Sequence, residues 1–577
     1  MQVAHFLEAD LQPWGAALAA ALFAPDPAQQ PPASTASAAG AAAVSGSASL
    51  RESAWHCLKE LSPLHGALDA VMRASELPLL EQLPRTPAEW QPAVIGSRAV
   101  AGALELSYHE AAACCDAMHA VRGVHALALH SQDCVAAYAA ADVPATAQFA
   151  EAVEAVGARV CTAVAALSSL RTLKLGLHRN VKGRAVKVPL TLLPALQRLS
   201  QLAVLELHGR ELDFDELAAP LRSLTTLTRL ALVDTNRSWG GARAPRGAAL
   251  ASALAHLPGL ADLWLRGATS SMLGPAFGPL TALTSLDVGR MSTHDNDVKA
   301  VAAGLGRLSR LAVLRLQYDR ARDIHAALAP ALGNLTALTV LDLSDWHRVD
   351  DNAEALAAAL QRLWRLAALS LRAIDIGATG AAALAPALGT LTALTLLDLG
   401  HNSVHANGVE ALAPALSRLS RLEHLCLHRN SVGATGAAAL APPIAQLTGL
   451  TLLDLRNNDI GAGGAASLAP ALGRLTRLAS LNLAANNVGA AGAAALAPCI
   501  APLMKLTRLD LEVNDVGEQG AASLAPVLRG LKQLRLLDLG HNDFDDGVLH
   551  PALALARSRA RSTCNKYLNA GLHQVRQ

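Results

Sequence analysis

The chain has 577 residues, of which 52% are hydrophobic but only 3% are aromatic, and 48 basic residues balance 47 acidic ones. This near-zero net charge gives no electrostatic reason to expect a nucleic acid or an anionic membrane as the main partner. The sequence contains no run of 18 or more apolar residues, so we expect no membrane span. A large core with so few aromatic residues must be built from leucine and alanine in a thin, regular geometry.

The first 99 residues are predicted to form three parts. Residues 1–23 are an N-terminal segment whose apolar stretch, Trp14–Phe23, follows acidic residues and therefore differs from a secretion signal. Residues 24–49 are rich in Ala, Ser and Pro and carry a single charge, so we expect a disordered linker. Residues 50–99 show helical spacing of their leucines and are predicted to form a small helical cap or module.

Residues 100–550 are predicted to form about 15 or 16 repeats, followed by a basic tail at residues 551–577. The six clearest units share the pattern LxxLxLxxN with anchors 28 residues apart, at Leu394, Leu422, Leu450, Leu478, Leu506 and Leu534. Upstream the frame continues with less regular spacing, with anchors at Leu366, Leu338, Leu311, Leu283, Leu260, Leu227, Leu202, Leu170 and Val124. A capping unit is predicted around Leu104 and Leu106.

Each repeat is predicted to be a strand followed by a helix. The paired leucines point to one side of the strand, and successive strands pair in parallel across a crossover helix. The asparagine that ends the motif is expected to bond backbone groups of the neighbouring repeat, at Asn402, Asn430, Asn458, Asn486, Asn514 and Asn542. Recurrent helical prolines predict short or kinked helices with the lost hydrogen bond facing solvent, at Pro386, Pro414, Pro442, Pro470, Pro498 and Pro526.

These 28-residue units, with LxxLxLxxN, a Gly-x-x-Gly turn and a full helix, resemble the ribonuclease-inhibitor subclass of leucine-rich repeats over residues 100–550. The resemblance implies an α/β solenoid shaped like a horseshoe, with parallel strands on the concave face and helices on the convex face. The subclass includes ribonuclease inhibitors, Ran GTPase-activating proteins, NOD-like receptors and repeat proteins of cilia. Fold does not fix function among them.

Two charged columns are predicted on the concave face, at outward strand positions. The position between the paired leucines is often acidic, as at Asp398, Asp454 and Asp538, and basic residues follow the strands, as at Arg372 and Arg456. One interpretation is a charged groove that complements a bipolar partner. The other is that the aspartates are solvated consensus residues that keep an open sheet from aggregating.

The irregular repeats carry the predicted protein-binding residues. Exposed aromatic and arginine side chains on one surface are typical of binding hot spots, and the candidates are Trp264, Arg266, Arg290, Arg315, Tyr318 and Trp346. An alternative for Trp346 is that it fills a malformed turn in the place of the usual asparagine.

No catalytic, cofactor-binding or metal-binding site is predicted. His424, Cys426 and His428 alternate along one strand, but a flat strand rarely brings three such side chains to one ion, so we interpret them as chance polar residues. The eight cysteines show neither zinc-binding nor disulfide spacing. Reduced thiols favour the cytoplasm, with a cilium or an organelle left open.

The sequence therefore predicts a non-enzymatic scaffold or adaptor that binds a protein partner, with no nucleic acid partner. One alternative is a Ran-type GTPase activator, which would use an arginine such as Arg179 or Arg210 near the first repeats. The basic tail departs from the acidic tail of that family. A second alternative is a structural subunit of a large assembly such as a cilium. Partner identity and oligomeric state are not predicted.

Overall fold

The computed structural model describes residues 103–107, 126–130, 169–176, 192–209, 212–234, 248–267, 270–292, 295–319, 324–345 and 353–543. The predicted parts at residues 1–23, 24–49, 50–99 and 551–577 lie outside these residues. The chain divides into two compact units, residues 1–212 with 234–237, and residues 213–233 with 238–577.

The first unit contains strands that pair in parallel in chain order. Its described elements are β1 (Ala103–Ser107), β2 (Ala126–His130), β3 (Thr172–Gly176), α10 (Leu192–Arg198) and β4 (Val204–Gly209). β1 contains Leu104 and Leu106 and pairs with β2, so the structure shows the strand of the predicted capping unit, whereas the rest of that unit lies outside the described residues.

The second unit continues the same alternation of strand and helix. Its strands are β5 (Arg229–Asp234), β6 (Asp262–Arg266), β7 (Ser285–Ser292), β8 (Val313–Asp319), β9 (Val340–Asp342), β10 (Ala368–Ser370), β11 (Leu396–Asp398), β12 (His424–Cys426), β13 (Leu452–Asp454), β14 (Ser480–Asn482), β15 (Arg508–Asp510) and β16 (Leu536–Asp538). They pair in parallel in chain order. Every strand from β2 to β16 begins two residues after a predicted anchor, so the repeat frame is confirmed.

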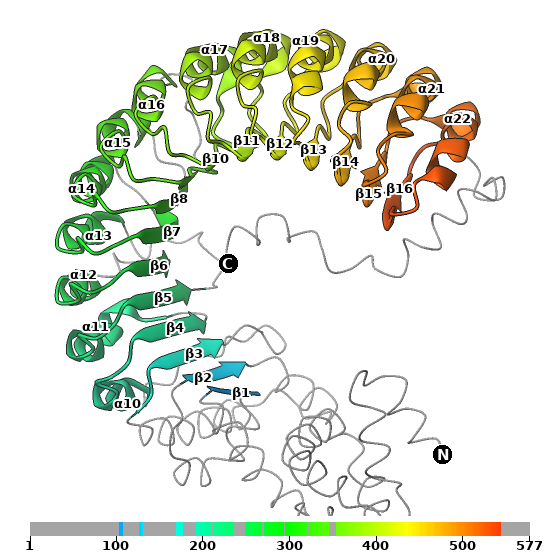
Figure 1. Ribbon diagram of the computed structural model, residues 1–577. Coiled ribbons are helices and arrows are strands. Elements are labelled where there is room, and N and C mark those ends of the chain that lie inside the picture. The colour runs from blue at the N-terminus through cyan, green and yellow to red at the C-terminus, as the bar shows by residue number, and fades with distance from the viewer. Residues whose placement is uncertain are drawn as a thin grey trace, which may run out of the picture. The chain divides into compact units, whose positions relative to one another are not determined.

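The helices of the second unit cover the outer side of an arc whose inner side is lined by the strands (Figure 1). They are α11 (Phe214–Ser223), α12 (Ala248–Leu254), α13 (Ser270–Phe277), α14 (Asp295–Leu305), α15 (Ile324–Leu332), α16 (Ala353–Leu360), α17 (Gly377–Leu388), α18 (His405–Leu416), α19 (Gly433–Gln446), α20 (Gly461–Leu472), α21 (Gly489–Ile500) and α22 (Gly517–Gly530). None of the described helices is long and apolar enough to cross a membrane.

The core is a row of leucines between the sheet and the helices. In one repeat, Leu450, Leu453 and Leu455 on the strand side and Leu468 and Leu472 on α20 are all fully buried. Burial of each such leucine side chain contributes roughly 1.5–3 kcal/mol to the free energy of folding. Small residues on the helices allow close stacking, since a Cβ on Gly464 would lie 2.9 Å from the Cβ of Ala437 on α19.

The recurrent prolines confirm the predicted solvent-facing position, and the helix lengths remove the first of the two predicted outcomes, a short helix. All six lie on the exposed side of their helices, so the missing N–H faces solvent as expected. The helices that carry them, α17 to α22, have 12 or 14 residues and are not short. Each of the six prolines is the tenth residue of its helix, and the helix continues for only two or four residues after it.

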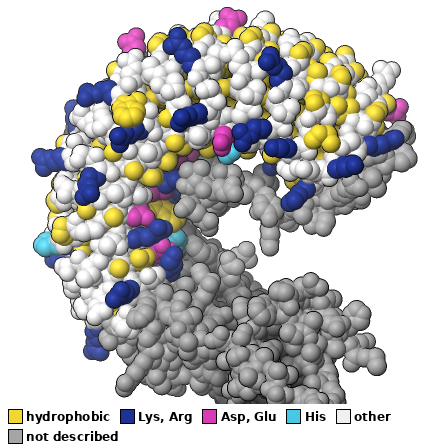
Figure 2. All heavy atoms as spheres, in the orientation of Figure 1, with side chains coloured by type: hydrophobic (Ala, Val, Ile, Leu, Met, Phe, Trp, Pro, Cys, Tyr) yellow, Lys and Arg dark blue, Asp and Glu magenta, His cyan; other side chains and the backbone are white. Residues whose placement is uncertain are grey.

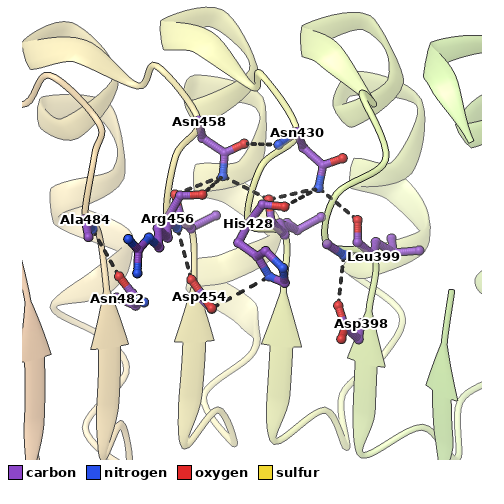
Figure 3. Close-up of polar contacts among 12 residues, drawn as sticks. Asp398, Leu399, His428, Asn430, Asp454, Arg456, Asn458, Asn482 and Ala484 are labelled. Carbon is purple, nitrogen blue, oxygen red and sulfur yellow. Dashed lines mark hydrogen bonds and ion pairs between the residues drawn. The ribbon is translucent and has the colours of Figure 1, made fainter. Parts of the chain in front are cut away.

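The asparagine ladder confirms the prediction of bonds between neighbouring repeats (Figure 3). Asn458 is fully buried, and its Oδ1 accepts the N–H of Asn430, at 2.9 Å. Its Nδ2 donates to the carbonyl of Leu427 in the preceding repeat and of Leu455 in its own, each at 2.9 Å. The same contacts recur along the ladder, which satisfies backbone groups that the turn buries.

Candidate protein-binding face

The outward positions between the paired leucines form one column across the strands of the second unit. Cross-strand register places these residues directly opposite one another in the order Ala231, Trp264, Asp287, Arg315, Asp342, Ser370, Asp398, Cys426, Asp454, Asn482, Asp510 and Asp538. In the first unit the same position pairs Lys174 with Glu206, whose charged atoms are 3.2 Å apart.

From Asp342 onward, the acidic residues of this column accept hydrogen bonds from the backbone where their strands end. Oδ1 of Asp398 accepts the N–H of Gly400 at 2.8 Å, and Oδ1 of Asp454 accepts the N–H of Arg456 at 3.0 Å. Asn482 makes the same bond to Ala484, at 3.1 Å (Figure 3). A side-chain oxygen that binds the backbone two residues ahead is the Asx turn for which Asp and Asn are favoured.

Burial of the column changes both interpretations of its charge. Asp398 is 5% exposed and Asp510 is 3% exposed, so these two carboxylates are neither solvated consensus residues nor open ligands for a bipolar partner. Asp454 and Asp538 are half-buried. The aspartates serve chiefly to end the strands, and only part of the column presents charge to solvent.

Burial is also the main cause of the titration behaviour of Asp398. It raises the pKa of this carboxyl to about 6, aided by the nearby carboxylates of Asp342 and Asp454. The N–H of Gly400 and the charge of Arg372 oppose the shift. A carboxyl with this pKa is partly protonated near neutral pH, which weakens the acidic column further.

The basic column beside it is interrupted and locally paired. The imidazole of His428 lies against Gly400, where a side-chain Cβ would overlap the ring, and its Nδ1 is 3.7 Å from Oδ2 of Asp454 (Figure 3). Burial lowers the pKa of His428 despite the opposing effect of Asp454. Arg456 lies 3.7 Å from Glu512, an acidic residue in the same column.

Three carboxylates lie close together at the C-terminal end of this face, a cluster that the sequence pattern did not predict. One carboxylate oxygen from each of Asp510, Glu512 and Asp538 lies within 4.8 Å of the other two. The 28-residue offset between Asp510 and Asp538 is one repeat, so it could have predicted that these two side chains lie on adjacent strands. Arg508 lies 3.4 Å from Asp510 and Arg456 faces Glu512, so neighbouring arginines already compensate part of this charge.

His424, Cys426 and His428 line β12 and its exit, as their spacing predicts. Burial raises the pKa of the Cys426 thiol well above its usual range, and the carboxylates of Asp398 and Asp454 add to the shift. Burial also lowers the pKa of His424. A thiol held in its neutral form is a poor metal ligand and a poor nucleophile.

Trp264, Arg266 and Arg315 form the part of the predicted hot spot whose side chains are described. The guanidinium carbon of Arg266 lies 5.5 Å from the ring centroid of Trp264. A Cβ on Gly289 would lie 3.0 Å from Nε of Arg266, so the arginine rests on a glycine of the next strand. Arg315 lies in the same column as Trp264, two strands further along the sheet.

The remaining hot-spot candidates are described only in part. Arg290 lies in β7 where its register with β8 shifts between Val288 and Met291, a local irregularity of the ladder. Tyr318 lies in β8 opposite Met291. The side chains of Arg290 and Tyr318, and all of Trp346, lie outside the described residues. Arg179 and Arg210, named for the GTPase-activating alternative, lie outside them as well.

Comparison with known proteins supports the repeat assignment. A family model described as Leucine Rich repeat matches residues 390–413, 447–469, 476–497 and 503–525. No curated protein matches the sequence. Together with the alternating strands and helices, the family matches show an α/β leucine-rich-repeat solenoid.

Two solved structures are similar to the chain at low identity. A leucine-rich-repeat protein of Leptospira interrogans is 18% identical with a TM-score of 0.40, and the match covers 68% of this chain and 94% of that one. An internalin of Listeria monocytogenes is 21% identical with a TM-score of 0.36, covering 62% and 80% respectively.

Proposed function

We propose that this leucine-rich-repeat protein is a non-enzymatic scaffold that binds a protein partner through the strand-lined inner face of its second unit. The observation that carries the proposal is the Trp264–Arg266 stack, with Arg315 in the same column two strands further along. Tryptophan and arginine dominate the energetics of protein interfaces, because each combines a large contact area with a polar group. The other proposed contacts are Arg290, Tyr318 and Trp346.

Preorganisation supports this placement. Trp264 and Arg266 are both half-buried, and Arg266 is held between the indole ring and Gly289. Side chains that are already fixed lose less conformational entropy when a partner covers them. The regular repeats from β11 onward use polar side chains at the position between the paired leucines for bonds to their own turns, whereas β6 and β8 carry Trp264 and Arg315 there.

The matched experiment compares two tryptophans that each stack with an arginine. Partners are captured with the full chain and identified by mass spectrometry, and their affinities for the purified chain are then measured by calorimetry. The Trp264→Ala, Arg315→Ala double variant is expected to weaken binding by roughly 30-fold or more. Trp364→Ala is the control, because Trp364 stacks on Arg365 at 4.8 Å outside the proposed face.

The result that would refute the proposal is equal affinity of the double variant and wild type for every captured partner. A loss of affinity in the Trp364→Ala control alone would also count against it, because that outcome places the contact elsewhere on the molecule.

The repeats also support the finer assignment to the ribonuclease-inhibitor-like subclass. Each of the six 28-residue units from β11 onward includes a helix of 12 or 14 residues or ends at the edge of the described residues. We further propose that the protein works in a reducing compartment such as the cytoplasm, since Cys426 and Cys499 are free thiols. Measuring partner binding with and without reductant tests this proposal. The reduced protein is expected to bind at least as tightly as the oxidised one, and tighter binding by the oxidised protein would contradict a reducing compartment.

A further inference from the structure

The turns that lead from each helix into the next strand form a strongly basic edge on the second unit. Between α13 and β16, the ten described turns of this kind contain one acidic residue, Glu423, and eleven basic ones. All eleven are exposed, and they are named the basic edge here: Arg307, Arg310, Arg362, Arg365, Arg418, Arg421, Arg474, Arg477, Lys505, Lys532 and Arg535.

Stacking of the repeats brings these residues onto one side of the unit. Because the strands pair in parallel and in register, turns of the same kind lie next to one another along the arc. Figure 2 shows one face on which Lys and Arg side chains outnumber Asp and Glu side chains along the arc of helices. The whole chain is nearly neutral, but this edge carries a local excess of positive charge.

The arginines of the basic edge occur in alternate repeats, and some of them pack against the preceding repeat. Arginine pairs occur in every second repeat from α14 to α20, and the intervening turns are uncharged, as at residues 389–395. A Cβ on Gly278 would lie 3.3 Å from Nη1 of Arg307, and one on Gly333 would lie 3.3 Å from Cδ of Arg362. These arginines therefore extend over a glycine of the preceding repeat while their side chains stay exposed.

No residue of the basic edge takes part in an ion pair within the described part of the chain. Two large apolar side chains lie on the same edge: Trp364 is 59% exposed and Met504 is 51% exposed. Both occupy the same repeat position, where the turn at residues 389–395 has Thr392. Exposed apolar residues among arginines that form no ion pair within the described residues favour a partner that is both anionic and apolar.

We propose that the basic edge binds an anionic lipid surface, with Trp364 and Met504 entering the interface between headgroups and acyl chains. A row of turns along one side of an arc can contact an extended surface at many points at once. Basic residues near anionic headgroups contribute about 1 kcal/mol each. Tryptophan favours the membrane interface because its ring is apolar and its N–H is polar.

A nucleic acid fits these observations less well. Binding along a single strand relies on repeated aromatic stacking platforms. The turns that form the basic edge contain one aromatic residue, Trp364, and Met504 cannot stack on bases. An acidic protein would satisfy the arginines and leave the two apolar side chains without a reason to be exposed.

Vesicle flotation with the full chain tests the proposal. The chain is expected to bind phosphatidylcholine vesicles that contain about one third phosphatidylserine, to ignore pure phosphatidylcholine vesicles, and to dissociate as salt is raised. The Arg418→Gln, Arg421→Gln variant is expected to lower the partition coefficient by roughly tenfold or more. The control removes two positive charges elsewhere, by Lys299→Gln on α14 with Arg429→Gln after β12, and is expected to change little.

A second variant tests the apolar contribution. Trp364→Ala with Met504→Ala is expected to weaken vesicle binding by roughly tenfold, most visibly at raised salt where the charge contribution is screened. The proposal is overturned if anionic vesicles do not bind, or if the charge control loses as much binding as the edge variant. It is also overturned if the apolar variant binds vesicles normally while a single-stranded oligonucleotide or polyglutamate displaces them, because the edge would then be a general polyanion site.

Discussion

Removal of one asparagine of the ladder should test how the solenoid is held together. In Asn458→Ala, the carbonyls of Leu427 and Leu455 each keep a second amide donor, from Asn430 and Asn486 respectively. The N–H groups of Asn430 and Val432 have no such reserve, because Oδ1 of Asn458 accepts both, at 2.9 and 3.4 Å. The cost therefore falls on one well-made and one long hydrogen bond from buried N–H groups.

Each buried N–H left without a partner costs about 1–3 kcal/mol. With a small cavity added, the free energy of unfolding is expected to fall by about 2–4 kcal/mol. Urea unfolding followed by circular dichroism measures this change. Asn407→Ala, an exposed position in α18, is the matched control and is expected to lose nothing.

Amide exchange locates the effect. The N–H of Asn430 should lose protection in Asn458→Ala, while the N–H of Asn486, which donates to Asn514, should keep it. Asn458→Asp offers a second check, because its side chain would face the carbonyls of Leu427 and Leu455, and only the protonated carboxyl, with its single O–H, can donate to one of them. Its folded-state pKa should be raised, so its stability should increase as pH falls. A loss below about 1 kcal/mol in Asn458→Ala, with Asn430 still protected, would refute the reasoning.

Two further predictions concern the strand exits. The raised pKa of Asp398, about 6 against 3.8, means that the folded protein binds this proton more tightly, so its contribution to stability decreases as pH rises from about 4 to 6. In Asp398→Asn the new side chain can bond Gly400 as Asn482 bonds Ala484. The variant should exceed wild type in free energy of unfolding by up to about 3 kcal/mol at pH 7, and this difference should be smaller at pH 5, as measured by urea unfolding. Gly400→Ala should destabilise the fold by about 1–3 kcal/mol through overlap with His428, and adding His428→Ala should restore most of the loss; no recovery would contradict the contact.

The repeat frame was predictable because it is local and periodic. A Leu-x-Leu pair can bury both side chains on only one face of a strand, so fifteen anchors mark fifteen strand starts without any knowledge of contacts. The role of the motif asparagine was predictable for the same reason, since its position in the turn leaves backbone groups that need a partner.

The candidate site was less predictable because it depends on neighbours from other repeats. Asp398 and Asp454 occupy equivalent positions, but only Asp398 is nearly fully buried, which follows from the side chains on adjacent strands. The stacking of Trp264 with Arg266 over Gly289 likewise depends on where β7 places its glycine. Neither result follows from the residue's own repeat.

Taken alone, the sequence determined that this protein is a leucine-rich ladder of parallel strands and helices, because hydrophobic periodicity is written in every repeat. Tertiary structure decided where charge accumulates. A net charge of +1 argued against anionic partners, yet stacking places eleven basic residues along one edge, where the chain enters the strands. At the other end of the strands, aspartates such as Asp398 and Asp454 bond the backbone of the turns. Net charge is a sum over the chain, whereas the field that a partner meets depends on which residues share a surface.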